Sequence, residues 1–302
     1  MKAREMVARM TGHAGKLGLP RECIHIVASY LDHLALHAME MTCRTFFESG
    51  IHGAYWRMSA LREAVVIPTE HTMDWKTLAC SCVNLDAQQT AGLLGNVVGD
   101  CDMIIAFSSV DRPREEGAKN TLRVSRCFRR MRARSDDGPQ QALLNYTLQT
   151  LICGCSQGDC YWSSAPSASE IQDDYIDYTL VDRCIIRAID IVPYKAFWQM
   201  GEPGYAPMKV SISFFTPGDS SNADRCMYYT SPSFDVVNRM EMQTFFLPRL
   251  VLAQANTHVR VNFHGKQQFE YVDAVDYPRR YFCCISHVGV NGILLPLNAE
   301  LH

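Results

Sequence analysis

Apolar residues recur at helical spacing along roughly the first hundred residues of the chain. Ile24, Val27, Ala28 and Leu31 occupy positions i, i+3, i+4 and i+7, which places them on one face of an amphipathic helix. Asp32 comes directly after this face and can cap a second helix. The pattern therefore predicts a small domain of short helices. The later apolar stripes are Met58, Leu61 and Val65, and then Trp75, Leu78, Ala79 and Cys82.

Beyond about residue 101 the apolar residues alternate with polar ones. Val210, Ile212 and Phe214, for example, are separated by single polar residues. Alternation predicts antiparallel strands with one buried and one solvated face, and the prolines and glycines between the runs are typical of an all-β sandwich or barrel. The other alternating runs are 144–152, 176–180 and 258–263.

An irregular stretch, 111–138, interrupts the strands and contains a run of basic residues without an acid among them. We interpret it as a solvated loop or insertion in the β domain, and a nuclear-localisation or nucleic-acid patch is the alternative. The basic residues are Arg123, Arg126, Arg129, Arg130, Arg132 and Arg134.

Composition narrows the class of protein. The 302 residues are 47% hydrophobic with a net charge of −3, which indicates a globular chain of two domains and argues against a protein dedicated to nucleic acids. The sequence contains no apolar run long enough for a membrane span, and residues 1–16 are too polar for a secretory signal. The cysteine count, 13, is odd, and several cysteines lie within apolar runs. We expect free thiols in a reducing compartment, the cytoplasm, the nucleus or both.

One segment carries a recognisable motif. From Leu19 the chain reads LPRECIHIVASYLDHLALHAMEMTCRTFFESGIHGAYWRM. This segment resembles the F-box in its Leu-Pro start, its helix ending in Tyr-Leu-Asp, its Cys-Arg-x-Phe helix and its closing Trp-Arg. The resemblance implies a three-helix F-box domain at 17–60 that docks on a Skp-type adaptor, which in turn holds a cullin and a RING subunit. The residues that match F-box core or adaptor-binding positions are Leu19, Pro20, Ile24, Tyr30, Leu31, Leu36, Cys43 and Trp56.

The β region also resembles a known group. Ala-x-Ser-Ser at 106–109, Asn-x-Leu at 120–122 and Trp-x-Ser at 162–164 are similar to the opening of galactose-binding-like jelly rolls. With the F-box, the chain looks like a plant-type F-box protein with such a sandwich behind it. We therefore predict a multidomain α + β chain: an F-box, a helical extension or linker over 61–100, and an antiparallel jelly-roll β-sandwich over 101–296.

Four aromatic residues near predicted loops are candidates for target binding: Tyr194, Phe197, Trp198 and Tyr205. Loops on a rigid scaffold are where recognition residues concentrate, and tyrosine and tryptophan combine a large contact area with one polar atom. The target is a protein in the first hypothesis. In the second, the sandwich is a lectin-like module that binds a glycan, with Trp198 near Glu202 as the candidate contact.

The sequence offers little support for catalysis. Cys153, Cys155 and Cys160 lack the paired spacing of structural zinc sites, and the histidines at 258, 264 and 287 fall on predicted strands without a nucleophile signature. Glycine-rich phosphate loops are also missing from the sequence. We predict a non-catalytic adaptor subunit without metal or cofactor.

Overall fold

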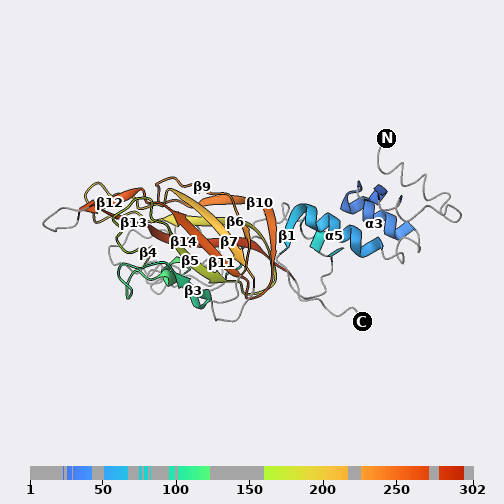
Figure 1. Cartoon of the computed structure of the whole chain (residues 1–302), viewed down its shortest axis with the longest axis horizontal. Helices are drawn as coiled ribbons and strands as arrows, with labels where there is room; N and C mark the ends of the chain where they lie inside the picture. The colour runs from blue at the N-terminus through green and yellow to red at the C-terminus, as the bar shows by residue number, and fades with distance from the viewer. Residues whose placement is uncertain are drawn as a thin grey trace, which may run out of the picture. The chain divides into compact units, whose positions relative to one another are not determined.

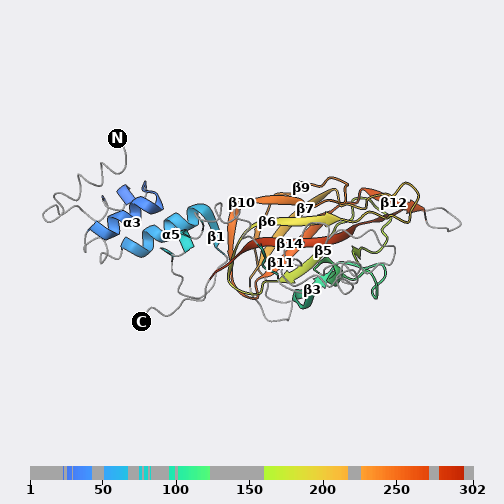
Figure 2. The same cartoon turned by 180° about the vertical axis from the view of Figure 1, so that it is seen from behind.

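The computed structural model describes residues 23, 26–28, 30–42, 51–66, 75–76, 78–80, 82, 95–98, 101–122, 160–216, 226–271 and 279–295. The chain divides into two compact units (Figures 1 and 2). The first comprises Met1–Leu93 with Arg249–Val251, and the second comprises Leu94–Pro248 with Leu252–His302. None of the described helices is long and apolar enough to cross a membrane.

The first unit contains the helices α3 (His33–Thr42) and α5 (Ile51–Glu63). Asp32 caps α3 as predicted, because its Oδ1 accepts a hydrogen bond of 2.8 Å from the backbone N–H of Ala35. The apolar side chains of Leu36 and Trp56 are buried. Tertiary packing of these side chains stabilises helices that are short for independent folding.

Part of the predicted helical extension is extended instead. Strand β1 (Ala64–Val66) begins where α5 ends, so Val65 does not continue a helical stripe. Two adjacent β-branched valines favour the strand. The guanidinium of Arg249 donates hydrogen bonds to the carbonyls of Leu61 at 2.6 Å and of Ala64 at 3.2 Å, which satisfies acceptors at the end of the helix. A second strand in this range, β2 (Gly95–Asn96), belongs to the second unit.

The second unit is an antiparallel β-sandwich, as predicted. One sheet contains the order β10-β6-β14-β2, with β4 paired to β14, and the other has the order β3-β5-β11-β7-β8, with β9 paired to β7. From β5 onward, successive long strands alternate between the two sheets, which is the arrangement of a jelly roll. The strands are β3 (Ile104–Phe107), β4 (Trp162–Ser163), β5 (Asp174–Thr179), β6 (Cys184–Pro193), β7 (Lys209–Phe215), β8 (Met227–Thr230), β9 (Phe234–Asp235), β10 (Gln243–Ala253), β11 (His258–His264), β12 (Gln268–Tyr271), β13 (Arg279–Phe282) and β14 (Cys284–Leu294).

The core lies between the two sheets. Trp162 of β4 and Phe263 of β11 meet there with ring centroids 5.6 Å apart. The predicted alternation is confirmed on three paired strands, since every second residue is completely buried. These residues are Val210, Ile212 and Phe214 on β7, Val259, Val261 and Phe263 on β11, and Ile176 and Tyr178 on β5.

The opposite face of these strands is not solvated, contrary to the prediction. Ser211 and Ser213 of β7 are buried, and Asn262 of β11 donates hydrogen bonds to both hydroxyls, at 3.2 and 3.1 Å. Asp177 of β5 is also buried and forms a bidentate ion pair with Arg260, at 2.6 and 2.8 Å. Polar partners therefore satisfy this face.

The predicted loop 111–138 is ordered and packed where the structure describes it. The 3-10 helix η2 (Ala118–Thr121) lies here, and Glu116, Asn120 and Thr121 are buried. The amide of Asn120 donates to the carbonyls of Glu115 and Tyr161, at 2.6 and 2.9 Å, so this segment is part of the sandwich. The six arginines from Arg123 to Arg134 and the predicted strand at 144–152 lie outside the described residues.

Candidate functional site

A pocket of about 130 Å³ opens at the end of the sandwich where β6 ends and β14 begins. The hairpin of β12 and β13 lies at this same end (Figures 1 and 2). Three kinds of group line the pocket: carboxylates with one guanidinium, aromatic rings, and small or amide side chains. They are Asp111, Arg112, Glu116 and Glu270; Tyr161, Tyr194, Trp198, Tyr205 and Phe282; and Ser163, Ala196, Gln199 and Cys284.

The aromatic side chains form a stack on one wall. Tyr161 and Tyr194 lie face to face with ring centroids 3.8 Å apart, and both tyrosines are buried. Trp198 follows, 6.1 Å from Tyr161 and 5.7 Å from Tyr194, and it remains 44% exposed. A buried pair of rings thus supports an indole that solvent or a ligand can reach.

The loop that carries Trp198 is fixed by hydrogen bonds across the base of the loop. The N–H of Ala196 donates to the carbonyl of Pro203 at 2.9 Å, and that of Tyr205 donates to the carbonyl of Tyr194 at 2.9 Å. Glu202, in this loop, has a φ of 46°, a left-handed conformation that is uncommon for residues other than glycine. Its carboxylate lies 2.5 Å from Nζ of Lys195, and this ion pair holds the turn.

Glu116 lines the pocket and is buried. Its Oε1 accepts a hydrogen bond from the guanidinium of Arg112 and another, of 2.6 Å, from the hydroxyl of Tyr161. Burial raises the pKa of Tyr161, and the hydrogen bond to Glu116 raises it further, so the phenol stays protonated and donates. The separate hydrogen bond that Arg112 donates to Glu116 raises the pKa of Arg112.

Glu270 reaches the pocket from β12. Its Oε1 accepts hydrogen bonds of 2.6 Å from the hydroxyl of Tyr205 and of 2.5 Å from the amide of Gln199. Asp111 lies on the loop after β3, and its pKa is raised by burial; Arg112 lowers it and Glu270 raises it. The influence of Glu270 on Asp111 indicates that carboxylates from two different elements approach the same volume.

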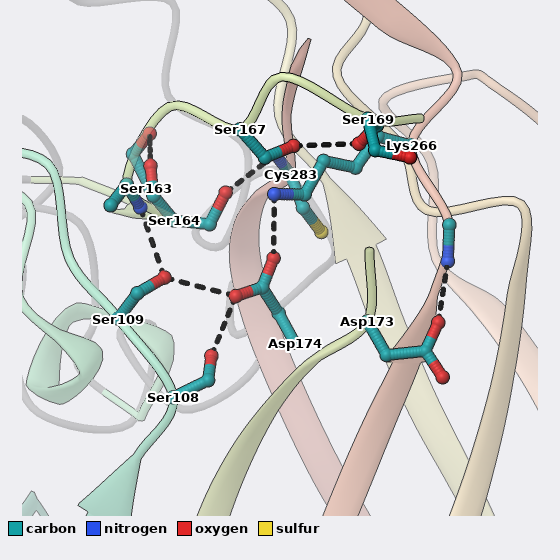
Figure 3. Close-up of polar contacts among 12 residues, drawn as sticks. Ser108, Ser109, Ser163, Ser164, Ser167, Ser169, Asp173, Asp174, Lys266 and Cys283 are labelled. Carbon is teal, nitrogen blue, oxygen red and sulfur yellow. Dashed lines mark hydrogen bonds and ion pairs between the residues drawn. The ribbon is translucent and has the colours of Figure 1, made fainter. Parts of the chain in front are cut away.

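A buried polar network lies next to the pocket and holds its loops (Figure 3). Nζ of Lys266 lies 3.0 Å from Oδ2 of Asp174, and both side chains are excluded from solvent. Oδ1 of the same carboxylate accepts hydrogen bonds from the hydroxyls of Ser108 and Ser109, at 2.7 and 2.9 Å. Ser109 also accepts a 3.0 Å bond from the N–H of Ala165, so the network ties β3 to the segment after β4.

The network continues to the strands that form the pocket. The hydroxyl of Ser164 accepts a hydrogen bond of 3.0 Å from the N–H of Cys283, and the carbonyl of Ser163 accepts one of 3.1 Å from the N–H of Asp111. Gly265 precedes Lys266 with a φ of 62°, and a Cβ there would lie 2.8 Å from Sδ of Met208. Any other residue would be strained at the turn that directs Lys266 inward, so glycine is favoured there.

The chemistry of the pocket favours binding over bond making. Cys284 is its one thiol-bearing lining residue, and burial raises the pKa of that thiol, which suppresses the nucleophilic thiolate. Glu116 and Glu270 already accept hydrogen bonds from neighbouring side chains. Asp111 is the exception among the carboxylates of the described lining. What remains is an aromatic wall with hydrogen-bond acceptors around it.

Three of the four predicted target-binding aromatics, Tyr194, Trp198 and Tyr205, line this one pocket. Phe197 does not, and its ring instead lies 5.2 Å from the ammonium of Lys195. Sequence reasoning missed Tyr161 and all four charged lining residues. Their positions depend on contacts between residues far apart in sequence, such as Tyr161 with Glu116, and no spacing rule reveals these.

The F-box residues separate into two groups where they are described. Leu31, Leu36 and Trp56 are buried, which assigns them to packing within the helical unit, whereas Tyr30 is 85% exposed. The prediction that Tyr30 contacts an adaptor remains a prediction. The remaining predicted positions, Leu19, Pro20, Ile24 and Cys43, lie outside the described residues, as do Cys153 and Cys155 of the weak zinc hypothesis.

Comparison with known proteins gives one relative in sequence and several in structure. No protein-family profile matches the chain. It is 28% identical over 177 residues to the F-box protein At4g00755 of Arabidopsis thaliana, a match that covers 52% of this chain and 45% of the relative. The chain therefore spans about half the length of the relative that it matches.

Similar solved structures include carbohydrate-binding modules. One is the family 32 module of EndoD from Streptococcus pneumoniae, with 13% identity, a TM-score of 0.36, and coverage of 66% of this chain and 99% of that chain. Another is chitosan-binding module 1 of a chitosanase/glucanase from Paenibacillus sp. IK-5, with 10% identity, a TM-score of 0.34, and coverage of 64% and 96%. The chain is thus similar in sequence to an F-box protein, and the strand order of its second unit is that of a jelly-roll sandwich.

Proposed function

We propose that this protein is a substrate-recognition subunit of an SCF-type cullin–RING ubiquitin ligase. The observation that carries the proposal is the F-box motif from Leu19 to Met58, together with the sequence similarity to an F-box protein. The N-terminal helices would dock on a Skp-type adaptor, and through it on a cullin and a RING subunit. The proposed compartment is the cytoplasm, the nucleus or both.

The proposed mechanism is proximity. The sandwich holds a target protein at the pocket of Tyr161, Tyr194 and Trp198, close to the ubiquitin-charged enzyme, and so converts an encounter in solution into a reaction within one complex. The chain itself contributes binding and orientation and performs no bond chemistry.

Co-purification of the full chain with a Skp-type adaptor tests this proposal. We expect the wild type to retain the adaptor and the double variant Leu19→Ala/Pro20→Ala to lose it. Tyr30→Ala is a third arm, because this exposed side chain can be removed without opening a core, whereas Leu31, Leu36 and Trp56 are buried and poor probes of an interface.

Met200→Ala is the matched control, since Met200 is fully exposed and belongs to the other unit. It should leave adaptor binding unchanged. Failure of the wild-type chain to retain the adaptor would overturn the ligase proposal.

A lectin-like glycan-binding module is the second candidate. It is favoured by the half-exposed Trp198 beside the carboxylates of Asp111 and Glu270, since an aromatic face can cover an apolar sugar face while carboxylates accept hydroxyl hydrogens. A glycan array probed with the full chain separates the candidates. Binding that Trp198→Ala abolishes would favour the lectin, and an array without binding would eliminate it.

A further inference from the structure

The pocket contains more negative than positive charge. Asp111, Glu116 and Glu270 line it together with one guanidinium, that of Arg112. That guanidinium is already committed, because it pairs with Glu116 and lies 3.3 Å from a carboxylate oxygen of Glu115. Asp111 has no hydrogen bond or ion pair through its side chain among the described residues, and the nearby Arg112, whose charge lowers its pKa, pairs with Glu115 and Glu116. The described lining therefore keeps an excess of negative charge.

Glu116 provides an independent sign of an absent donor. Its Oε1 accepts two hydrogen bonds, but its Oε2 is buried and has no hydrogen-bond partner within the described part of the chain. A buried acceptor left without a donor costs stability, and most such atoms in proteins are satisfied. Glu116 lines the pocket, so a donor entering from solvent would approach this carboxylate.

The aromatic wall suits the same kind of ligand. The faces of tyrosine and tryptophan attract a cation within about 6 Å of the ring centre, most strongly where water is displaced. Trp198 is the half-exposed member of the stack, and Tyr161 and Tyr194 hold it in place. The pocket, of about 130 Å³, has room for a compact cationic group.

We propose that this pocket binds the ammonium group of a lysine side chain presented by the target protein. The inference deepens the proposed function, and it rests on that function for the protein nature of the target. The ammonium lies against Trp198 and donates toward Asp111 and the Glu116 end of the pocket.

Lysine fits better than the competing ligands. Its ammonium is compact, donates three hydrogens in different directions and sits on a flexible apolar stem, whereas arginine presents a planar fork suited to the two oxygens of one carboxylate. Here the acceptors come from different elements, the loop after β3 and β12, which suits three hydrogens that point in different directions. A neutral sugar would leave the excess negative charge uncompensated.

The test is ligand-observed NMR titration of the full chain with the peptide acetyl-Gly-Gly-Lys-Gly-Gly-amide. The matched probe replaces lysine by norleucine, which keeps the stem and removes the charge, and further arms replace it by arginine or use free D-glucosamine. We expect binding of the lysine peptide, weakened by added salt because the attraction is electrostatic. The norleucine peptide should not bind.

Two substitutions locate the contact. Trp198→Ala and Asp111→Asn should each weaken binding by about two- to thirtyfold, the range expected for a cation–π contact or a single charge contact. Phe197→Ala controls for the tryptophan, because Phe197 is its neighbour, is 37% exposed and does not line the pocket. Asp235→Asn controls for the aspartate, since Asp235 is exposed on β9 and also lies outside the pocket lining. Both controls should bind as the wild type does.

Several results would overturn the inference: no binding of the lysine peptide, equal binding of the norleucine peptide, tighter binding of arginine or glucosamine, or equal effects of the pocket and control variants. Adaptor co-purification on the same preparations keeps the two proposals apart. If the chain retains the adaptor but does not bind the lysine peptide, only the proposal of a lysine ligand is refuted. If it binds the peptide but does not retain the adaptor, only the proposed ligase role is refuted.

Discussion

Two acidic regions meet at the same end of the sandwich, and they differ in whether their charges are compensated within the chain. In the first, Asp174 has a lysine partner at 3.0 Å and two serine hydroxyls, and solvent is excluded. In the second, Asp111 lines a pocket next to the half-exposed Trp198 and has no ion pair of its own among the described residues, because the nearby Arg112 pairs with Glu115 and Glu116. Ser163 connects the two, because it lines the pocket and accepts a hydrogen bond from the N–H of Asp111, while its hydroxyl donates to the carbonyl of Ser164 in the network.

The difference indicates which groups maintain the fold and which are left for a ligand. A buried carboxylate must be paired and hydrogen-bonded, and the closed network of Lys266 satisfies this requirement for Asp174. A carboxylate that lines a pocket and has no ion pair within the described chain can instead bind a cationic group of a ligand. The same residue types therefore stabilise structure in one region and provide recognition in the other.

The largest expected effect is a loss of stability when the buried pair of Asp174 and Lys266 is broken. Lys266→Met leaves the carboxylate of Asp174 buried without its cation, which should cost about 3–5 kcal/mol in the free energy of unfolding. Lys209→Met is the matched control, because Lys209 pairs with Asp235 at 3.0 Å on the exposed surface, and it should cost less than about 1 kcal/mol. Urea denaturation measures both. Equal losses in the free energy of unfolding would contradict the distinction between a buried and an exposed ion pair.

A smaller effect is expected at the boundary between the regions. Tyr161→Phe removes the hydroxyl that donates to Glu116 at 2.6 Å and should cost about 1–3 kcal/mol, because a buried acceptor loses a partner. Tyr175→Phe is the comparison, since the Tyr175 ring packs 3.8 Å from the guanidinium of Arg260 and its hydroxyl has no hydrogen bond within the described residues. Thermal unfolding should show almost no change for Tyr175→Phe. If Tyr161→Phe left the unfolding temperature unchanged, Glu116 would not need the hydrogen bond from the tyrosine for stability.

The smallest effect is the dependence of ligand binding at the Asp111 pocket on pH. Burial raises the pKa of Asp111 above its ordinary value of 3.8, so this carboxylate takes up its proton at a higher pH than an unperturbed aspartate. Because only the charged form attracts an ammonium, binding of the lysine peptide should weaken as pH falls through that raised value, by about fivefold for the loss of one charge contact. The groups that face Asp111 are Arg112 on its own loop, Glu116, and Glu270 from β12.

The matched measurement is the same pH series on Asp111→Asn. This variant should bind weakly at every pH and lose most of the pH dependence. A wild-type profile that is flat from pH 7 to pH 4 would contradict a role for Asp111.

Local patterns in the sequence predicted the parts of the molecule that depend on local rules. The alternation of Val259, Val261 and Phe263 identified β11 and its buried face, and Asp32 was recognised as a helix cap. Aromatic residues near loop signals led to Tyr194, Trp198 and Tyr205, which the fold brings to one pocket.

The remainder depends on long-range contacts that no local pattern encodes. Val65 fits a helical stripe, yet the strand β1 begins at Ala64. Asp174 and Lys266 are far apart in sequence and are brought together by the pairing of β5 with β11. The segment around Glu116 looks like a polar loop, and its burial follows from the hydrogen bonds to Arg112 and Tyr161.

A crystal structure of the full chain soaked with the acetyl-Gly-Gly-Lys-Gly-Gly-amide peptide tests the central claim most directly. The account predicts the lysine ammonium between the Trp198 ring and the Asp111 carboxylate, within hydrogen-bond distance of that carboxylate, and a lower peptide occupancy in Asp111→Asn crystals soaked at the same concentration. An ordered lysine elsewhere on the sandwich, or equal occupancy in Asp111→Asn, would contradict it.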